Sequence, residues 1–231
     1  MNNQIAKKFD TLSLLKFTLP SMIMMLFMAL YQMVDAVFVS NFVSETALSA
    51  LNIVYPLISF IIAVAVMLAT GGSAVIAKKM GEGEHALARQ LFSMVVLIGV
   101  LFGIAMTLVG IFFTRPLIHL MGSTPALDPY CYDYLYTLML FSPFAVLQLL
   151  FQTFFITAGK PHLDLVVTVL AGIANIFFDF LFIVVIPLGV KEAAYGTAIG
   201  YCIPAIFGLI FFSLDRNGSL RFVKPTFDAP V

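Results

Sequence analysis

Two aspartates lie in stretches of the sequence that are otherwise almost entirely apolar. Asp35 follows TLPSMIMMLFMALYQMV, and Asp179 follows LVVTVLAGIANIFF, with Asn175 one helical turn earlier. Ionising a carboxyl group in hydrocarbon is costly, so such groups face a protein interior or a water-filled cavity, where they titrate, pair or bind an ion. The two aspartates therefore indicate a protein that moves an ion or a solute rather than one that only serves as a scaffold.

The composition indicates that these aspartates belong to a membrane protein. Hydrophobic residues make up 61% of the 231 residues, charged residues make up only 10%, and the mean hydropathy is +1.06. Soluble domains carry about 25% charged residues. The formal net charge is +0. The lipid bilayer is the expected surrounding, and no nucleic-acid partner is predicted.

Hydropathy predicts an all-α polytopic membrane protein with six transmembrane helices. Each predicted span can cross a hydrocarbon core of roughly 30 Å, which needs about 20 residues. The spans cover 14–39, 47–70, 90–113, 130–158, 163–187 and 193–213. We expect residues 1–213 to form one six-span lobe and the short, polar stretch 214–231 to form a cytoplasmic linker.

Basic residues are divided unevenly between the two sides of these spans. Of the 12, only Arg115 and Lys191 lie on the side away from the termini. The others are Lys7, Lys8, Lys16, Lys78, Lys79, Arg89, Lys160, Arg216, Arg221 and Lys224. Cytoplasmic loops carry an excess of Lys and Arg. The sequence therefore predicts an integral protein of the plasma (cytoplasmic) membrane with both termini in the cytoplasm.

Four polar side chains fall in the outer half of the membrane in this orientation. Asp35 and Thr197 lie ~6 Å, and Asp179 ~12 Å, below the outer ends of their spans, given the helical rise per residue. Asn175 lies one turn deeper than Asp179 on the same helix face. One cavity can collect all four groups if the first, fifth and sixth spans lie together.

Further polar and aromatic residues form a candidate substrate cavity. Tyr31 lies one turn from the first aspartate, and Tyr134 and Tyr201 lie deeper than the interfacial tyrosines. An aromatic cavity beside carboxylates suits a lipophilic cation, although packing explains these tyrosines equally well. Gln148 and Gln152 share one face of the fourth span, where interhelical hydrogen bonds are favoured over substrate contacts.

Other special residues have structural interpretations. Asp133 and Asp164 lie near span ends, where the membrane interface can solvate them. Two Gly-x-x-x-Gly pairs, at 99–103 and 196–200, suit close packing of helices. The three histidines lie in loops without metal-ligand spacing. The chain contains no ATP-binding module, so uphill transport would use an ion gradient.

Several segments carry a resemblance to a known transporter family. They are LPSMIMMLFMALYQMVDAVFVS, ETALSALNIVYPL, GGSAVIAKKMGEGEHALA, FFITAGKPHLDLVVTVLAGIANIFFDFLFI and AAYGTAIGY, in chain order. Together they resemble the multidrug and toxic compound extrusion (MATE) transporters over nearly the whole chain. The last two segments resemble the family's connection between the fourth and fifth spans with its Asn-x-x-x-Asp helix, and the start of its sixth span.

The resemblance implies roles for individual residues. Members of the family use carboxylates in the first lobe to bind H⁺ or Na⁺ in exchange for an organic cation. The positions that match are Asp35, Asn175, Asp179 and Thr197. Their oxygens would hold Na⁺, while protonation of either aspartate would suffice for H⁺. Tyr31 and Tyr134 match cavity positions of the family. No catalytic residue, no other metal and no cofactor beyond the coupling ion is implied.

The chain departs from the family in its length. The family has twelve spans in two lobes, whereas this sequence has one lobe and stops in what resembles the inter-lobe linker. A truncated fragment, a half that pairs with a second six-span chain, and a homodimer are the three explanations. An even number of spans gives two copies the same orientation, so a homodimer is topologically allowed. We expect a fragment, because the linker-like tail ends without a natural cap.

The expected function is secondary active antiport that exports organic cations or drugs in exchange for H⁺ or Na⁺. One alternative is a lipid-linked oligosaccharide flippase of the same superfamily, which needs a more cationic cavity than these acidic spans provide. A non-transporting half or fragment is another. The Gly-x-Gly-Asp context of intramembrane aspartyl proteases is absent around both aspartates, so no enzymatic activity is expected.

Overall fold

The structure is a bundle of α-helices, which confirms the predicted all-α class. It is a computed structural model that describes residues 11–38, 45–185, 190–215 and 218–224, without some of the side chains in these ranges. The elements are α1 (Thr11–Phe38), α2 (Glu45–Gly81), α3 (His85–Leu120), α4 (Asp128–Leu140), α5 (Ser142–Thr157), α6 (Pro161–Asp179), the π-helix η3 (Phe180–Val185) and α7 (Val190–Leu214).

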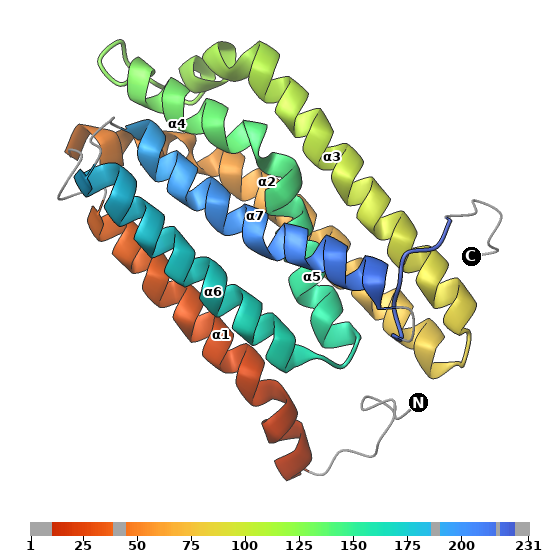
Figure 1. Cartoon of the computed structure of the whole chain (residues 1–231). Coiled ribbons are helices and arrows are strands. Elements are labelled where there is room, and N and C mark those ends of the chain that lie inside the picture. The colour runs from red at the N-terminus through yellow and green to blue at the C-terminus, as the bar shows by residue number, and fades with distance from the viewer. Residues whose placement is uncertain (1–10, 39–44, 186–189, 216–217, 225–231) are drawn as a thin grey trace.

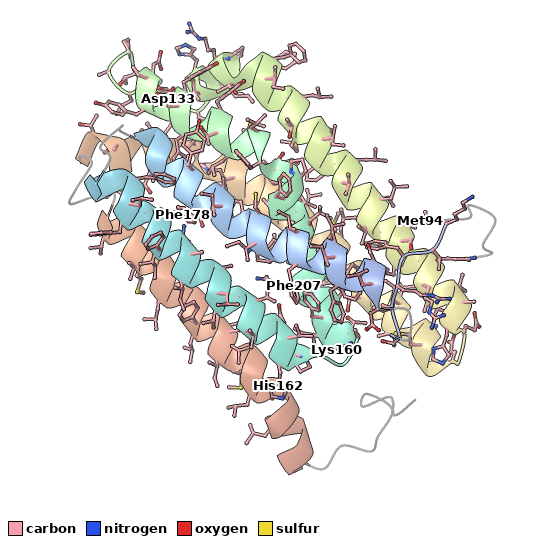
Figure 2. The ribbon with its side chains drawn as sticks, in the orientation of Figure 1. Met94, Asp133, Lys160, His162, Phe178 and Phe207 are labelled. Atoms are coloured by element: carbon pink, nitrogen blue, oxygen red, sulfur yellow. The ribbon has the colours of Figure 1, made fainter. Side chains whose placement is uncertain are left out.

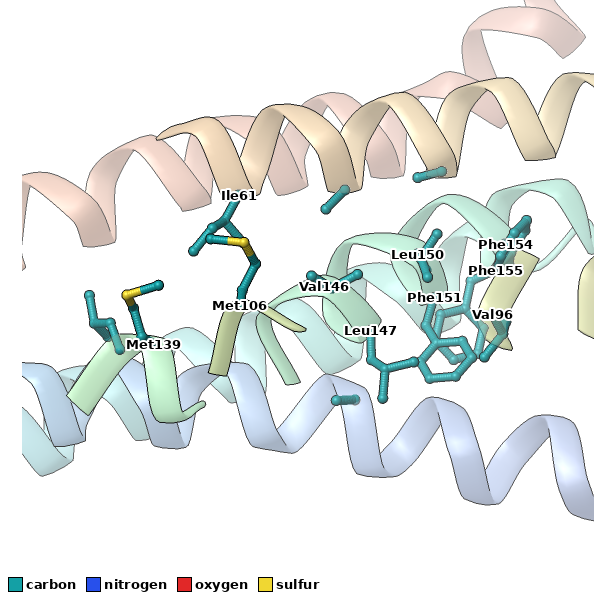
Figure 3. Close-up of a cluster of buried hydrophobic side chains, with 14 of the residues drawn as sticks. Ile61, Val96, Met106, Met139, Val146, Leu147, Leu150, Phe151, Phe154 and Phe155 are labelled. Carbon is teal, nitrogen blue, oxygen red and sulfur yellow. The ribbon is translucent and has the colours of Figure 1, made fainter. Parts of the chain in front are cut away.

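Helix α7 lies in the middle of the bundle (Figure 1). It packs against α4, α5 and α6, and α1 packs along α6. On the other side, α2 and α3 pack against each other and against α5. Apolar side chains from α2, α3, α4 and α5 fill the space between these helices (Figure 3). The pair of α1 and α6 is therefore joined to the rest of the bundle mainly through α7.

Four of the described helices are long and apolar enough to cross a membrane. They comprise Thr46–Gly81, His85–Leu120, Pro161–Phe182 and Ala194–Leu214. A fifth candidate is the bent pair formed by α4 and α5. The first predicted span, 14–39, coincides with the 28-residue helix α1. Helices α2 and α3 run well past the predicted spans 47–70 and 90–113, because their polar ends continue the helix beyond the hydrocarbon.

The outer surface of the bundle is as apolar as its interior. Met25 and Leu26 on α1, Met67 on α2 and Phe112 on α3 each expose more than half of their surface. A soluble protein rarely leaves such large contiguous apolar patches in water. Lipid is the solvent that suits this surface.

The two ends of the bundle carry different charges. The start of α1, the α2–α3 turn, the α5–α6 turn and the end of α7 share one end, here called the basic end (Figure 1). Its described basic side chains are Lys78, Lys79, Arg89, Lys160, Arg221 and Lys224. At the opposite end, the Arg115 guanidinium lies 5.5 Å from the centre of the Tyr132 ring. The assignment of the basic end to the cytoplasm stays a prediction.

The predicted span 130–158 is broken rather than continuous. Helices α4 and α5 meet at Phe141 with a bend of 55°. Pro143 has no N–H to pair with the carbonyl of Met139, so one backbone hydrogen bond is missing at this point. The hydroxyl groups of Thr107 and Ser142 lie 3.0 Å and 2.8 Å from that carbonyl oxygen. Side chains thus satisfy the backbone group that the proline frees, as a lipid environment requires.

The segment after α7 folds back onto α3. The Arg89 guanidinium donates hydrogen bonds to the carbonyls of Gly218 and Ser219 at 3.2 Å and 3.3 Å. The Phe222 ring centre lies 5.1 Å from that of Phe92, and Leu220 is buried. Residues 218–224 therefore pack on the bundle. Residues 216–217 and 225–231 lie outside the described residues, and the interpretation of 214–231 as a linker between lobes stays a prediction.

The broken span depends on close contact with a glycine of α3. A Cβ atom at Gly103 would lie 2.5 Å from Cα and 2.9 Å from N of Pro143, and backbone atoms cannot move aside cheaply. We expect Gly103→Ala to lower the free energy of unfolding by about 1–3 kcal/mol, the range for overpacked sites.

Gly71→Ala on α2 is the matched control, because a Cβ there meets nothing within 4 Å. It should be neutral, or stabilising by at most about 1 kcal/mol through helix propensity. Unfolding midpoints of the two purified variants in one detergent measure the difference. Equal midpoints would show that the bend does not depend on this contact.

Candidate functional site

Helix α6 buries four polar residues along one side, together with Val167 and Ala171, and exposes large apolar residues on the other. Asp164, Thr168, Asn175 and Asp179 are at most 3% exposed, and their spacing puts them along one side of the helix. Val166, Leu170, Ile173 and Phe177 on the other side are all more than half exposed. This pattern is the reverse of a soluble helix, and it gives the bundle a polar interior line along α6.

The predicted ion-binding residues Asn175 and Asp179 meet two glycines of α7. A Cβ atom at Gly196 would overlap Oδ1 of Asp179, and one at Gly200 would lie 3.4 Å from Cβ of Asn175. These contacts confirm that the pair 196–200 lets two helices approach closely. They also show a role that the sequence reasoning missed, because the glycines make room for the polar pair itself.

The helix changes its geometry directly after Asp179. Helix α6 ends there, and Phe180–Val185 continue as the π-helix η3. A π-helical turn shifts the backbone hydrogen bonds from i→i+4 to i→i+5 and is frequent at functional sites. Asp179 thus stands at the junction of two helical geometries, with its side chain fully buried.

The glutamines of α5 face the same interior line. Gln152 donates a hydrogen bond from Nε2 to Oγ1 of Thr168 at 3.3 Å, which confirms the predicted interhelical role for this residue. Gln148 is 6% exposed. Its Oε1 is buried and accepts no hydrogen bond from the described part of the chain.

Several buried polar atoms on this line lack a donor among the described residues. They are Oε1 of Gln148, both carboxyl oxygens of Asp164 and Oδ1 of Asn175. All of them are oxygens. Buried acceptors are normally paired, since leaving one unpaired costs free energy. A group of unpaired acceptors in a lipid-surrounded protein attracts a proton or a cation.

The remaining predicted residues are distributed as follows. Asp35 and Tyr31 belong to α1, which packs along α6, but their side chains lie outside the described residues. Thr197 is half-buried on α7 beside Gly196. Tyr134 is buried on α4. The structure therefore brings Asn175 and Asp179 together with the start of α7.

A separate small pocket involves one of the predicted cavity residues. Tyr201 lines it with Ile58, Ile61 and Leu138. The lining is almost entirely apolar, and Tyr134, Gln148 and Gln152 take no part in it. Of the predicted cavity residues, Tyr201 thus lines this pocket, whereas Gln152 contacts the polar line of α6.

The prediction for Asp164 is wrong. It was expected to be solvated at a span end, but only 1% of its surface is exposed. The position of Asp164 near the end of its span predicted contact with water. Its burial instead follows from the side of α6 on which it lies. The spacing of Asp164, Thr168, Asn175 and Asp179 was the signal that could have revealed this. Asp133 is only partly buried and lies at the end opposite Lys160 and His162 (Figure 2).

Comparisons with known proteins agree with this architecture. The MatE family model matches residues 20–181. The multidrug export protein MepA of Staphylococcus saprophyticus is 24% identical over 216 residues, which cover 92% of this chain and 48% of that protein. The chain thus spans about half the length of the curated relatives it matches.

Two solved structures illustrate the similarity in fold. The MATE multidrug transporter DinF-BH has a TM-score of 0.85 at 26% identity, over 90% of this chain and 47% of that one. A MOP superfamily transporter from Pyrococcus furiosus, described by the reverse polarity of its binding pocket, has a TM-score of 0.89 at 21% identity. Its match covers 100% of this chain and 51% of that one.

The apolar exterior and the buried polar line of α6 are those of a membrane protein. The family match covers more than half of the sequence, so the chain belongs to the MatE family. Members of this family are transporters and not enzymes, which confirms the expected absence of enzymatic activity.

The contact between Gly196 and Asp179 can be tested by substitution. Gly196→Ala would force the carboxyl group to move, so we expect a loss of about 1–3 kcal/mol in unfolding free energy. Gly200→Ala is the matched control on the same helix, since its Cβ would make an ordinary contact. Unfolding midpoints of both variants give the comparison.

A double-mutant cycle identifies the colliding group. In an Asp179→Ala background the carboxyl group is gone, so Gly196→Ala should cost less there than in the wild type. An equal cost in both backgrounds would mean that the alanine collides with something other than the Asp179 side chain.

Proposed function

We propose that this chain forms one lobe of a secondary antiporter that exports organic cations or drugs in exchange for H⁺ or Na⁺. The observation that carries the proposal is the burial of Asn175 and Asp179 against the glycines of α7 in a MatE-family fold. Asp35, Asn175, Asp179 and Thr197 form the coupling site in this proposal.

Electrostatics favour a cation at this site. The described residues bury two carboxyl groups, Asp164 and Asp179, and no Lys or Arg side chain. A buried negative charge far from water is stabilised by a proton or by a cation with oxygen ligands. Carboxyl, amide and hydroxyl oxygens are the ligands that Na⁺ would require, and protonation of an aspartate would serve H⁺.

The same charge can couple the ion to a cationic substrate. When H⁺ or Na⁺ occupies the site from outside, it cancels the charge that would hold the substrate, and the substrate leaves. When the ion departs inside, the charge returns and a new cation binds. Coupling of this kind requires opposing effects of the two ligands on one site or conformation.

Tyr31, Tyr134, Gln148, Gln152 and Tyr201 are the proposed substrate-facing residues. Aromatic faces attract lipophilic cations, and amide groups can hydrogen-bond polar parts of a substrate. The name of the staphylococcal relatives, multidrug export protein, supports drug-like substrates. Because the chain spans half of those relatives, we propose a second six-span lobe or a second copy of this chain as its partner.

An oligosaccharide flippase is the second candidate, and pocket polarity separates the two. The Pyrococcus furiosus transporter is described by a pocket of reverse polarity that suggests a different function for that protein. Here, the charged groups buried in the described residues are acidic. An acidic interior disfavours a pyrophosphate-linked lipid and favours a cation.

Efflux of a lipophilic cationic dye tests the proposal. The assay uses cells that express the chain alone or as a tandem fusion of two copies. We expect gradient-driven efflux that falls to the empty-vector rate in Asp35→Asn and in Asp179→Asn. The matched control is Asp133→Asn, because Asp133 is partly buried and lies at the end of the bundle opposite the basic end. This variant should retain efflux. Wild-type efflux by the Asp35 and Asp179 variants would overturn the site assignment.

The coupling ion can be identified from stability. A ligand that binds only the folded state stabilises it by about 2.7 kcal/mol at a hundred times its dissociation constant. If Na⁺ is the coupling ion, replacing choline by Na⁺ at constant ionic strength should raise the unfolding midpoint of the wild type. If H⁺ is the coupling ion, lowering the pH should raise it instead. Asp179→Asn should remove the effect. An effect of equal size in the variant would place the ion elsewhere.

A further inference from the structure

Asp164 is a buried carboxyl group that the proposed coupling site does not use. It lies in the first turn of α6 at the basic end, only 1% exposed. Fifteen residues separate it from Asp179, which is about 22 Å along a helix. The two carboxyl groups are therefore far too distant to share one ion.

The charged groups that the structure describes around Asp164 do not neutralise it. Lys160 donates a hydrogen bond from Nζ to Oδ2 of Asp215 at 2.8 Å, and Nζ lies 4.4 Å from the centre of the Phe211 ring. His162 is exposed on α6 (Figure 2). Helix α5 carries no charged residue, and on α1 the side chain of Lys16 is outside the described residues.

Hydrogen bonding does not satisfy the carboxyl group either. The Thr168 hydroxyl, one turn along α6, interacts with it, but neither oxygen accepts a hydrogen bond of normal geometry within the described structure. The dipole at the helix N-terminus stabilises a nearby negative charge by up to ~2 kcal/mol. The cost of burying an unpaired charge is several kcal/mol, so the dipole alone does not offset it.

A proton fits this site better than a metal ion. Sodium or another hard cation needs several oxygen ligands, and Asp164 is the only acidic side chain among the described residues that is buried at this end of the bundle. A proton needs one carboxyl oxygen. Thr168 already accepts a hydrogen bond from Gln152, so its own hydroxyl proton remains available to the carboxyl group.

We propose that Asp164 is a second proton-binding site of this lobe, at the basic end and independent of the Asn175–Asp179 site. The inference goes beyond the proposed function, because protonation of Asp164 requires neither a substrate nor a second lobe. Thr168, Gln152 and Gln148 continue the polar line from Asp164 toward Asn175. A proton held at Asp164 would thus occupy the end of that line nearest to the predicted cytoplasm.

Infrared difference spectroscopy at stepped pH tests the proposal on the purified full-length chain in lipid nanodiscs. The C=O stretch of a protonated carboxyl group is resolved from that of a carboxylate. We expect the wild type to show a protonated-carboxyl band that titrates reversibly, and Asp164→Asn to lack one component of it. Asp179→Asn should retain that component.

Asp215→Asn is the matched control at the same end of the bundle, because Asp215 is paired with Lys160 and partly exposed. It should leave the component unchanged. Asp164→Glu keeps a carboxyl group, so the component should persist at a shifted frequency even if the asparagine variant folds poorly. A wild-type spectrum in Asp164→Asn, or a component that never loses its proton while the protein is folded, would overturn the proposal.

These outcomes are separable from those of the efflux assay. If neither the wild-type chain nor its variants exported the dye, antiport by this chain would be contradicted. The infrared band of the protonated Asp164 carboxyl group would still be present. Absence of the Asp164 component would leave the dependence of efflux on Asp35 and Asp179 unaffected.

Discussion

The close approach of α6 and α7 at Gly196 is the contact on which the interior of this lobe depends. Lipid supplies no hydrophobic force that pushes helices together, so small residues and polar contacts must hold them. The absence of a side chain at Gly196 leaves room for the Asp179 carboxyl group between the two helices. A larger residue at this position would force the carboxyl group out of the space that it now occupies.

The same constraint explains how the bundle tolerates its broken span. No water reaches the hydrocarbon region, so every backbone group freed by a proline needs a partner within the protein. Thr107 and Ser142 provide hydroxyl groups at the carbonyl that Pro143 leaves unpaired. Gly103 lets α3 come close enough for Ser142 to reach its carbonyl as well, at 2.8 Å. At the bend, a small residue allows close helix packing and hydroxyl groups bond to backbone carbonyls. At Asp179, Gly196 likewise leaves room for a buried polar group.

Much of the fold was predictable because hydropathy reports depth in the membrane directly. Of the six predicted spans, four are matched by described helices that are long and apolar enough to cross a membrane, or five with the bent pair of α4 and α5, and the Asn175–Asp179 spacing correctly placed both residues on one buried face of α6. Hydropathy does not show which side of a helix a residue faces, because it is averaged over all residues of a window. For that reason Asp164 was misjudged, although its spacing from Thr168, Asn175 and Asp179 marked the buried face. The bend at Phe141 depends on contacts between α3, α4 and α5, which no single segment of sequence encodes.

The distribution of charge follows the architecture of the lobe. Lys and Arg side chains gather mainly at one end of the bundle, while the charged groups buried in the described interior are the carboxyls of Asp164 and Asp179. Wherever these carboxyls are ionised they attract cations and repel anions, because charges in a low-dielectric medium are weakly screened. The buried amide oxygens of Gln148 and Asn175 add acceptors that receive no hydrogen bond within the described structure. In the antiport proposed above, a cation that enters this interior would meet acidic groups, because the charged groups buried among the described residues are both carboxyls.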